Sequence, residues 1–158
     1  MAKFIRQPPN SPEGVTWIAG GEVDEYRISL GIFGDDLNPD DISSRLGGTP
    51  TFKCAKGDVT VMKGVSRVER TGRWRLSLPA QPGESLGPQL ERLLGGLTQD
   101  ISIWQAIGER YKVRFVVAAW IRSWNRGLGI SPELLRKLAD RGLGLGIDIY
   151  VDYEEGDD

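Results

Sequence analysis

The fold of this chain is decided by the stretch YRISLGIF at residues 26–33. Its large apolar side chains, Tyr26, Ile28, Leu30 and Ile32, occupy every second position. In an extended strand, alternate side chains point to opposite faces, so these four lie together on one face. This alternation is typical of a sheet with one buried and one open face, and it predicts helices on a single side of a sheet.

Three further segments favour strands: 73–78, 113–121 and 145–153. The run at 113–121 is the most apolar in the chain, which predicts a central strand. Residues 49–72 fit no single pattern. Within them, 51–55 and 59–62 fit either short strands or a long excursion.

Helix signals separate these strands. Asn38 and Pro39 are typical of an N-cap and a first helical residue, and Gly47 ends the short apolar face that follows. Ser131 and Pro132 repeat this start before the last predicted strand. Leucine spacing predicts two more helical segments, at 86–97 and 101–107.

Two strand–helix–strand units therefore occur in order, and they predict an α+β fold of the ferredoxin-like βαβ–βαβ kind. In that plan an antiparallel sheet carries helices on one face, and the helices of 86–107 form an insertion. We expect a single domain at 22–153, preceded by a flexible lead-in at 1–21 and followed by an acidic tail at 154–158.

Composition excludes much of the catalytic repertoire. The 158 residues include no histidine and one cysteine, Cys54, and the formal net charge is −2. Nucleophilic machinery that needs histidine, His-bearing zinc sites and CxxC motifs cannot be built. No signal-peptide core or span of ~20 apolar residues is present, which predicts a cytoplasmic protein without a membrane anchor. We expect no enzyme activity, no cofactor and no metal.

The open face of the predicted sheet is the most informative surface. Alternation places on it the set Arg27, Arg73, Arg75, Arg114, Trp120, Arg122, Asp148, Tyr150 and Asp152. Arginine, tryptophan and tyrosine dominate the energetics of protein interfaces. We expect these residues to bind a protein partner, with a homodimer seam as one alternative and a plain solvated face as the other.

Two other interpretations of charge were weighed. Asp35, Asp36, Asp40 and Asp41 could hold a divalent ion or could serve turn and helix-start chemistry, and their spacing matches no EF-hand. Lys53 to Arg75 contains seven basic residues against two acidic ones, while residues 148–158 hold six acids and no base. The first stretch could meet phosphate, but the aromatic pattern of an RNA-binding sheet is missing, which argues against nucleic acid.

The order of the motifs resembles a bacterial domain-of-unknown-function family, number 4279. The resemblance rests on GDDLNPDDISSRLG at 34–47, GRWRLS at 72–77, GISPELLRKLA at 129–139 and IDIY at 147–150. It implies no catalytic residues, but small families of this kind include immunity proteins. We therefore expect a non-catalytic binding protein that neutralises a cognate toxin. The alternative is a small-molecule-sensing regulatory module of ferredoxin-like type.

Overall fold

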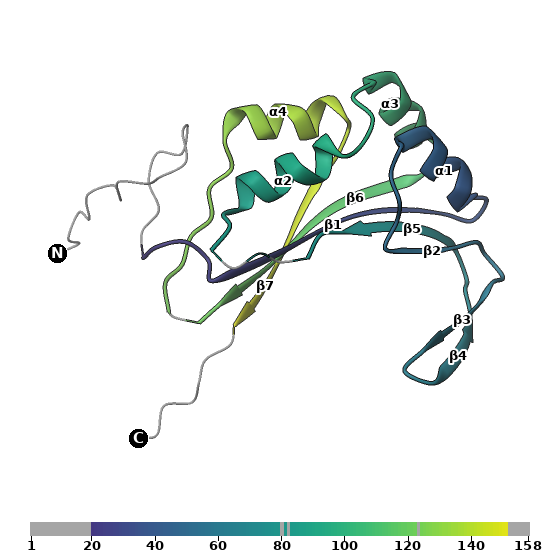
Figure 1. Ribbon diagram of the computed structural model, residues 1–158, viewed down its shortest axis with the longest axis horizontal. Coiled ribbons are helices and arrows are strands. Elements are labelled where there is room, and N and C mark those ends of the chain that lie inside the picture. The colour runs from purple at the N-terminus through teal and green to yellow at the C-terminus, as the bar shows by residue number, and fades with distance from the viewer. Residues whose placement is uncertain (1–19, 80, 82, 123, 152–158) are drawn as a thin grey trace.

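A computed structural model describes residues 20–79, 81, 83–122 and 124–151. Helices cover one side of a five-stranded sheet, and a two-stranded hairpin projects from the opposite side (Figure 1). This arrangement confirms the predicted α+β class with helices on a single face. The predicted lead-in at 1–21 and acidic tail at 154–158 fall almost wholly outside the described residues.

The elements follow one another in a simple order. The strands are β1 (Glu25–Gly34), β2 (Phe52–Cys54), β3 (Val59–Met62), β4 (Val65–Val68), β5 (Gly72–Ser77), β6 (Lys112–Ile121) and β7 (Leu145–Val151). The helices are α1 (Pro39–Leu46), α2 (Leu86–Gly95), α3 (Ile101–Arg110) and α4 (Pro132–Asp140). Among the described residues, no helix is both long and apolar enough to cross a membrane.

The strand order is β2-β5-β1-β6-β7, and it does not confirm the ferredoxin-like arrangement. In that arrangement β7 would lie antiparallel beside β1, whereas β7 runs parallel to β6. The reason is that β1 is already paired on both edges, antiparallel to β5 and to β6. The free edge of β6 remains, and the connection through α4 carries the chain back to it in the parallel direction.

Residues 49–72 form two kinds of structure. β2 adds a short antiparallel edge strand to β5. β3 and β4 pair only with each other, in a separate hairpin whose register runs from Val59 opposite Val68 to Met62 opposite Val65. Of the two alternatives left open for 51–55 and 59–62, the structure has the short strands, and β4 is an addition that the sequence pattern had not indicated.

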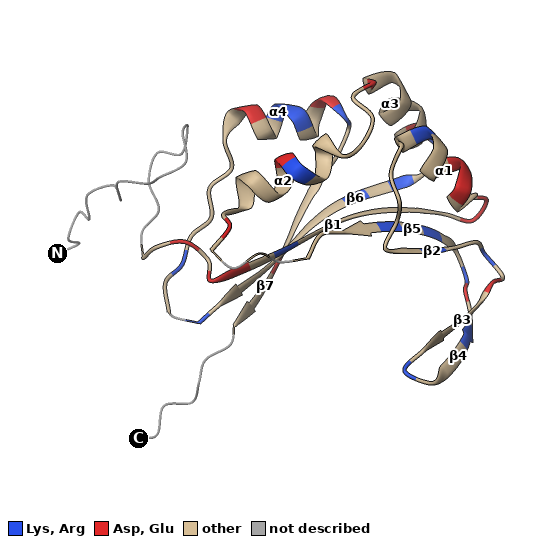
Figure 2. Ribbon diagram, in the orientation of Figure 1, with Lys and Arg blue, Asp and Glu red and all other residues tan. Residues whose placement is uncertain are grey.

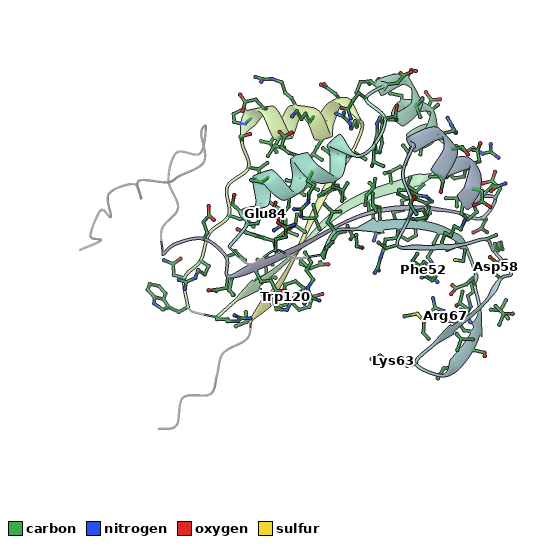
Figure 3. All side chains as sticks on the ribbon, viewed as in Figure 1. Phe52, Asp58, Lys63, Arg67, Glu84 and Trp120 are labelled. Atoms are coloured by element: carbon green, nitrogen blue, oxygen red, sulfur yellow. The ribbon has the colours of Figure 1, made fainter. Side chains whose placement is uncertain are left out.

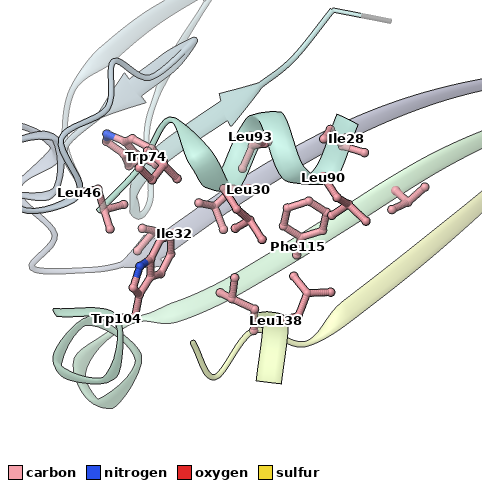
Figure 4. Packing of buried hydrophobic residues seen from close by; sticks show 14 of the residues in the cluster. Ile28, Leu30, Ile32, Leu46, Trp74, Leu90, Leu93, Trp104, Phe115 and Leu138 are labelled. Carbon is pink, nitrogen blue, oxygen red and sulfur yellow. The ribbon is translucent and has the colours of Figure 1, made fainter. Parts of the chain in front are cut away.

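The hydrophobic core lies between the sheet and the helices (Figure 4). Ile28, Leu30 and Ile32 of β1 are buried, as their alternation predicted. Leu90 of α2 and Leu138 of α4 pack against the same cluster from the helical layer. Fully burying one such side chain contributes about 1.5–3 kcal/mol, so the buried row of β1 makes a large contribution to the stability of the domain.

The predicted helix starts are confirmed in detail. Asn38 Oδ1 accepts a hydrogen bond from the Asp40 amide at 2.9 Å, and Ser131 Oγ accepts one from the Leu134 amide at 3.3 Å. Each satisfies an amide that a helix leaves without an internal partner. Gly47 ends α1 with φ of 73°, a left-handed conformation that favours glycine.

We predict that Leu30→Ala lowers the free energy of unfolding by about 3 kcal/mol, because Leu30 is fully buried and its truncation leaves a cavity. Urea denaturation followed by circular dichroism measures this change. Leu135→Ala is the matched control: Leu135 is exposed on α4, and its loss should change stability by less than about 0.5 kcal/mol. Equal effects of the two substitutions would contradict the assignment of β1 to the centre of the core.

Candidate functional site

The side of the sheet that faces away from the helices is called the open face here. In Figure 3, Phe52 and Trp120 lie on this side, below the ribbon of the sheet. By strand alternation and register it carries Arg27, Ser29, Gly31 and Phe33 of β1, Arg73, Arg75 and Ser77 of β5, Lys112, Arg114, Val116, Ala118 and Trp120 of β6, and Asp148 and Tyr150 of β7. Neither the helices nor the described loops form a second layer over it.

Most of the residues predicted for this surface lie on it. Seven of them, Arg27, Arg73, Arg75, Arg114, Trp120, Asp148 and Tyr150, have the parity of the open face. Arg122 follows the end of β6, where its amide donates to Asp24 Oδ2 at 2.8 Å and its side chain stays exposed. Asp152 lies outside the described residues. The three arginine-bearing strands are adjacent, and the aspartate lies on the edge strand.

One end of the open face is an aromatic stack. The rings of Trp120 and Tyr150 are parallel within 13° and their centroids are 4.9 Å apart. The guanidinium of Arg27 lies 4.8 Å from the centroid of Trp120, and Glu25 accepts a 3.0 Å hydrogen bond from Arg27. Stacking and cation–π contacts favour this one arrangement of the three side chains.

The other end of the open face is basic. Arg75 and Arg114 lie directly opposite Gly31 on its two neighbouring strands, and Arg73 and Lys112 flank Phe33 in the same way. Figure 2 shows this basic colouring on β5 and on the start of β6. Among the described residues, Arg75, Lys112 and Arg114 have no carboxylate within ion-pair distance. Their charge is therefore available to an incoming group.

The hairpin of β3 and β4 extends from the basic end (Figure 1). Five of its apolar side chains are between 56% and 67% exposed, namely Val59, Val61, Met62, Val65 and Val68. A hairpin outside the main sheet is marginal in isolation, and exposed apolar side chains of this density mark interaction surfaces. The sequence analysis had not assigned these residues to a surface, although VTVM at 59–62 carries the β-branched composition of a strand.

A buried carboxylate ties the hairpin to the sheet. Glu69 lies at the base of the hairpin and is only 3% exposed. It accepts hydrogen bonds from Thr60 of β3, from Arg67 of β4 at 3.0 and 3.1 Å, and from Arg73 of β5. These bonds, that from Arg67 first, lower the pKa of Glu69 to about 2. The carboxylate thus joins three strands in one cluster.

A cavity of about 1120 Å³ lies against this cluster. Its lining combines Phe33 of β1 with basic side chains, among them Arg67, Arg70 and Arg73. Glu69 also lines it, but its charge is engaged by Arg67 and Arg73. The cavity therefore presents a net positive lining with an apolar floor.

The aspartates near the start of α1 have separate basic partners: Asp35 with Lys56, Asp36 with Arg110, Asp40 with Lys53 and Asp41 with Arg45. The hydrogen bond from Lys56 lowers the pKa of Asp35, and that from Arg110 lowers the pKa of Asp36. Within the described part of the chain, no group of three or more Cys, Asp or Glu side chains is placed to hold a metal ion. Each of these four aspartates therefore has a basic partner of its own within the described residues.

The family model described as "Domain of unknown function (DUF4279)" matches residues 24–152. The match covers most of the chain, so the chain belongs to this family, as its motifs indicated. No match was found among curated proteins or among solved structures. The matched residues include the whole sheet, the hairpin and the open face.

We predict that Glu69→Gln destabilises the protein at pH 6, because the variant loses charge-assisted hydrogen bonds at the base of the hairpin. The folded pKa of Glu69 is about 2 against an ordinary 4.5, so its contribution is present above about pH 4.5 and is lost as the pH falls toward 2. Melting temperatures of wild type and variant should therefore converge over that interval.

Glu109→Gln is the matched control, since Glu109 is exposed on α3 and lies in none of the ion pairs of the described residues. Its melting curve should follow that of wild type at every pH. A Glu69→Gln deficit that stays constant from pH 6 to pH 2 would contradict the assigned ionisation.

Proposed function

We propose that this chain is a non-catalytic binding protein that docks a protein partner on its open face. We propose further that the partner is a cognate toxin, which the chain neutralises as an immunity protein. The observation that supports docking is the open face itself. It is left uncovered by the described parts of the chain, and it carries arginine, tryptophan and tyrosine together.

The aromatic end has the properties of an interface hot spot. Tryptophan, tyrosine and arginine contribute most where they are rigid and can be fully desolvated. Trp120, Tyr150 and Arg27 are already stacked on one another. Ordering a flexible side chain at an interface costs about 0.5–1.5 kcal/mol, and most of that cost is avoided when the side chain is held in place beforehand.

The hairpin adds apolar contact area beside the basic end. Standard protein interfaces bury about 800 Å² on each partner and combine an apolar centre with charged margins. The open face and the hairpin together supply both kinds of surface, because Val68 of the hairpin and Arg73 of β5 line the same cavity. The open face is extended, whereas sites for small ligands bury most of the surface of their ligand.

An immunity protein that neutralises a toxin by covering its active site fits the amino-acid composition of this chain. With no histidine in its 158 residues, the chain lacks the side chain that most nucleophilic and general acid–base mechanisms use. An immunity protein needs no chemistry of its own, since it acts by covering the active site of the toxin. Charge complementarity across such a contact raises the rate of association and excludes wrong partners.

We predict that Trp120→Ala weakens partner binding about 30-fold or more, which corresponds to about 2 kcal/mol at a hot spot. Isothermal titration calorimetry against the purified partner measures this change. Trp124→Ala is the matched control: Trp124 is 85% exposed and lies beyond the end of β6, and its truncation should leave the affinity within about twofold. Full loss with Trp124→Ala and none with Trp120→Ala would place the interface away from the open face.

We predict that the product of the adjacent gene is the toxin and that it co-purifies with the tagged chain after co-expression. Growth of cells that express this product should be restored by the wild-type chain and not by Trp120→Ala. Circular dichroism of the variant shows whether it is folded. If the product of the adjacent gene neither binds nor is neutralised, the immunity role is wrong.

A further inference from the structure

Seven basic side chains in the described part of the chain have no ion-pair partner there: Lys63, Arg70, Arg75, Lys112, Arg114, Arg136 and Arg141. Arg75, Lys112 and Arg114 lie on the open face, Lys63 lies between the two strands of the hairpin, and Arg70 lies between β4 and β5. The other two are on the helical side: Arg136 lies on α4, and Arg141, which is buried, ends this helix. The other eleven basic side chains of the described residues each form an ion pair with an aspartate or glutamate of this chain. The unpaired positive charge is therefore concentrated on the side of the sheet that carries the open face and the hairpin.

The sheet register places this charge on both sides of the middle of β1, and this part of the open face is called the trough here. Gly31 lies between Arg75 and Arg114, so a position without a side chain separates two guanidinium groups. Strands in a sheet are spaced by about 4.8 Å, which places the Cα atoms of Arg75 and Arg114 roughly 10 Å apart. A Cβ atom on Gly31 would meet the ring of Phe33 at 2.7 Å, so this ring covers the glycine. The trough therefore consists of the Phe33 ring on β1 with basic residues on both neighbouring strands, β5 and β6.

The trough adjoins the cavity at the base of the hairpin. Phe33 and Arg73 line the cavity and also stand on the open face, beside Lys112 and Gly31. Arg70 adds a further unpaired cation to the cavity wall. The volume of about 1120 Å³ exceeds the roughly 300–1,000 Å³ of pockets for small ligands, and it can hold several residues of a peptide.

We propose that an acidic, extended segment of the partner protein occupies this trough and the adjoining cavity. Its carboxylates would pair with Arg75 and Arg114 across Gly31, and Arg70 would meet a further carboxylate in the cavity. This inference rests on the proposed docking function and assigns a chemistry to the partner. Arginine is suited to the role because its planar guanidinium binds a carboxylate through two parallel hydrogen bonds.

A protein segment fits this surface better than a nucleic acid does. At the opposite end of the open face, Asp148 forms no ion pair among the described residues and would repel a phosphate backbone that ran along the sheet. Trp120 and Tyr150 already stack on each other, whereas binding of single strands relies on aromatic faces that are free for bases. A protein can instead place carboxylates at one end and neutral or basic groups at the other.

The test uses the full chain and a fluorescein-labelled peptide of eight glutamates, followed by fluorescence anisotropy. We expect saturable binding that weakens as the salt concentration rises. The double variant Arg75→Glu with Arg114→Glu should lower the affinity at least about tenfold, since it reverses the charge on both sides of the trough. Arg136→Glu is the matched control, because it reverses an exposed and unpaired cation on the helical side and should leave the affinity unchanged.

Three outcomes would overturn the inference: no binding of the peptide, equal affinity in wild type and double variant, or tighter binding of a single-stranded oligonucleotide than of the peptide. Measured with the adjacent-gene product, the same variants separate this inference from the docking function. If Trp120→Ala abolishes binding of that product and the double variant does not, the proposal of an acidic segment is wrong, while the docking function stays supported. If the peptide binds and its binding depends on Arg75 and Arg114, but the adjacent-gene product does not bind, only the immunity role is contradicted.

Discussion

The pairing of β1 along both of its edges is the constraint on which the rest of the structure depends. Because β5 and β6 occupy these edges, β7 can join only beyond β6, and the sheet becomes mixed rather than antiparallel. The same strand supplies the buried row under the helices and the glycine at the centre of the open face. One strand therefore fixes both the stability of the domain and the layout of its exposed side.

Much of this could be predicted from local patterns. The alternation in residues 26–33 determines which side chains are buried, and the same parity places Arg75, Arg114 and Trp120 on the other side. Asn38 and Ser131 indicated where their helices begin, because a capping side-chain oxygen accepts a hydrogen bond from an amide only two or three residues further along the chain. The family and the α+β class followed from these signals in order.

Other features depend on contacts that a local pattern does not contain. Alternation reveals that 145–151 is a strand but not its direction, so the parallel pairing with β6 could not be predicted. The cluster around Glu69 unites Thr60, Arg67 and Arg73 from three strands, and no spacing in the sequence marks it. The valines of the hairpin resemble buried strand residues, and only the structure shows that they remain exposed.

Glu69 also determines what kind of device the hairpin is. A two-stranded projection with a loose base would behave as a tether that searches for its target and loses entropy on capture. The buried carboxylate instead bonds Thr60 and Arg67 of the hairpin and Arg73 of β5, and this restrains the base of the hairpin relative to the sheet. For a partner docked as proposed, selectivity can then arise from shape, because a protein too broad to fit beside the hairpin would be excluded whatever its charge.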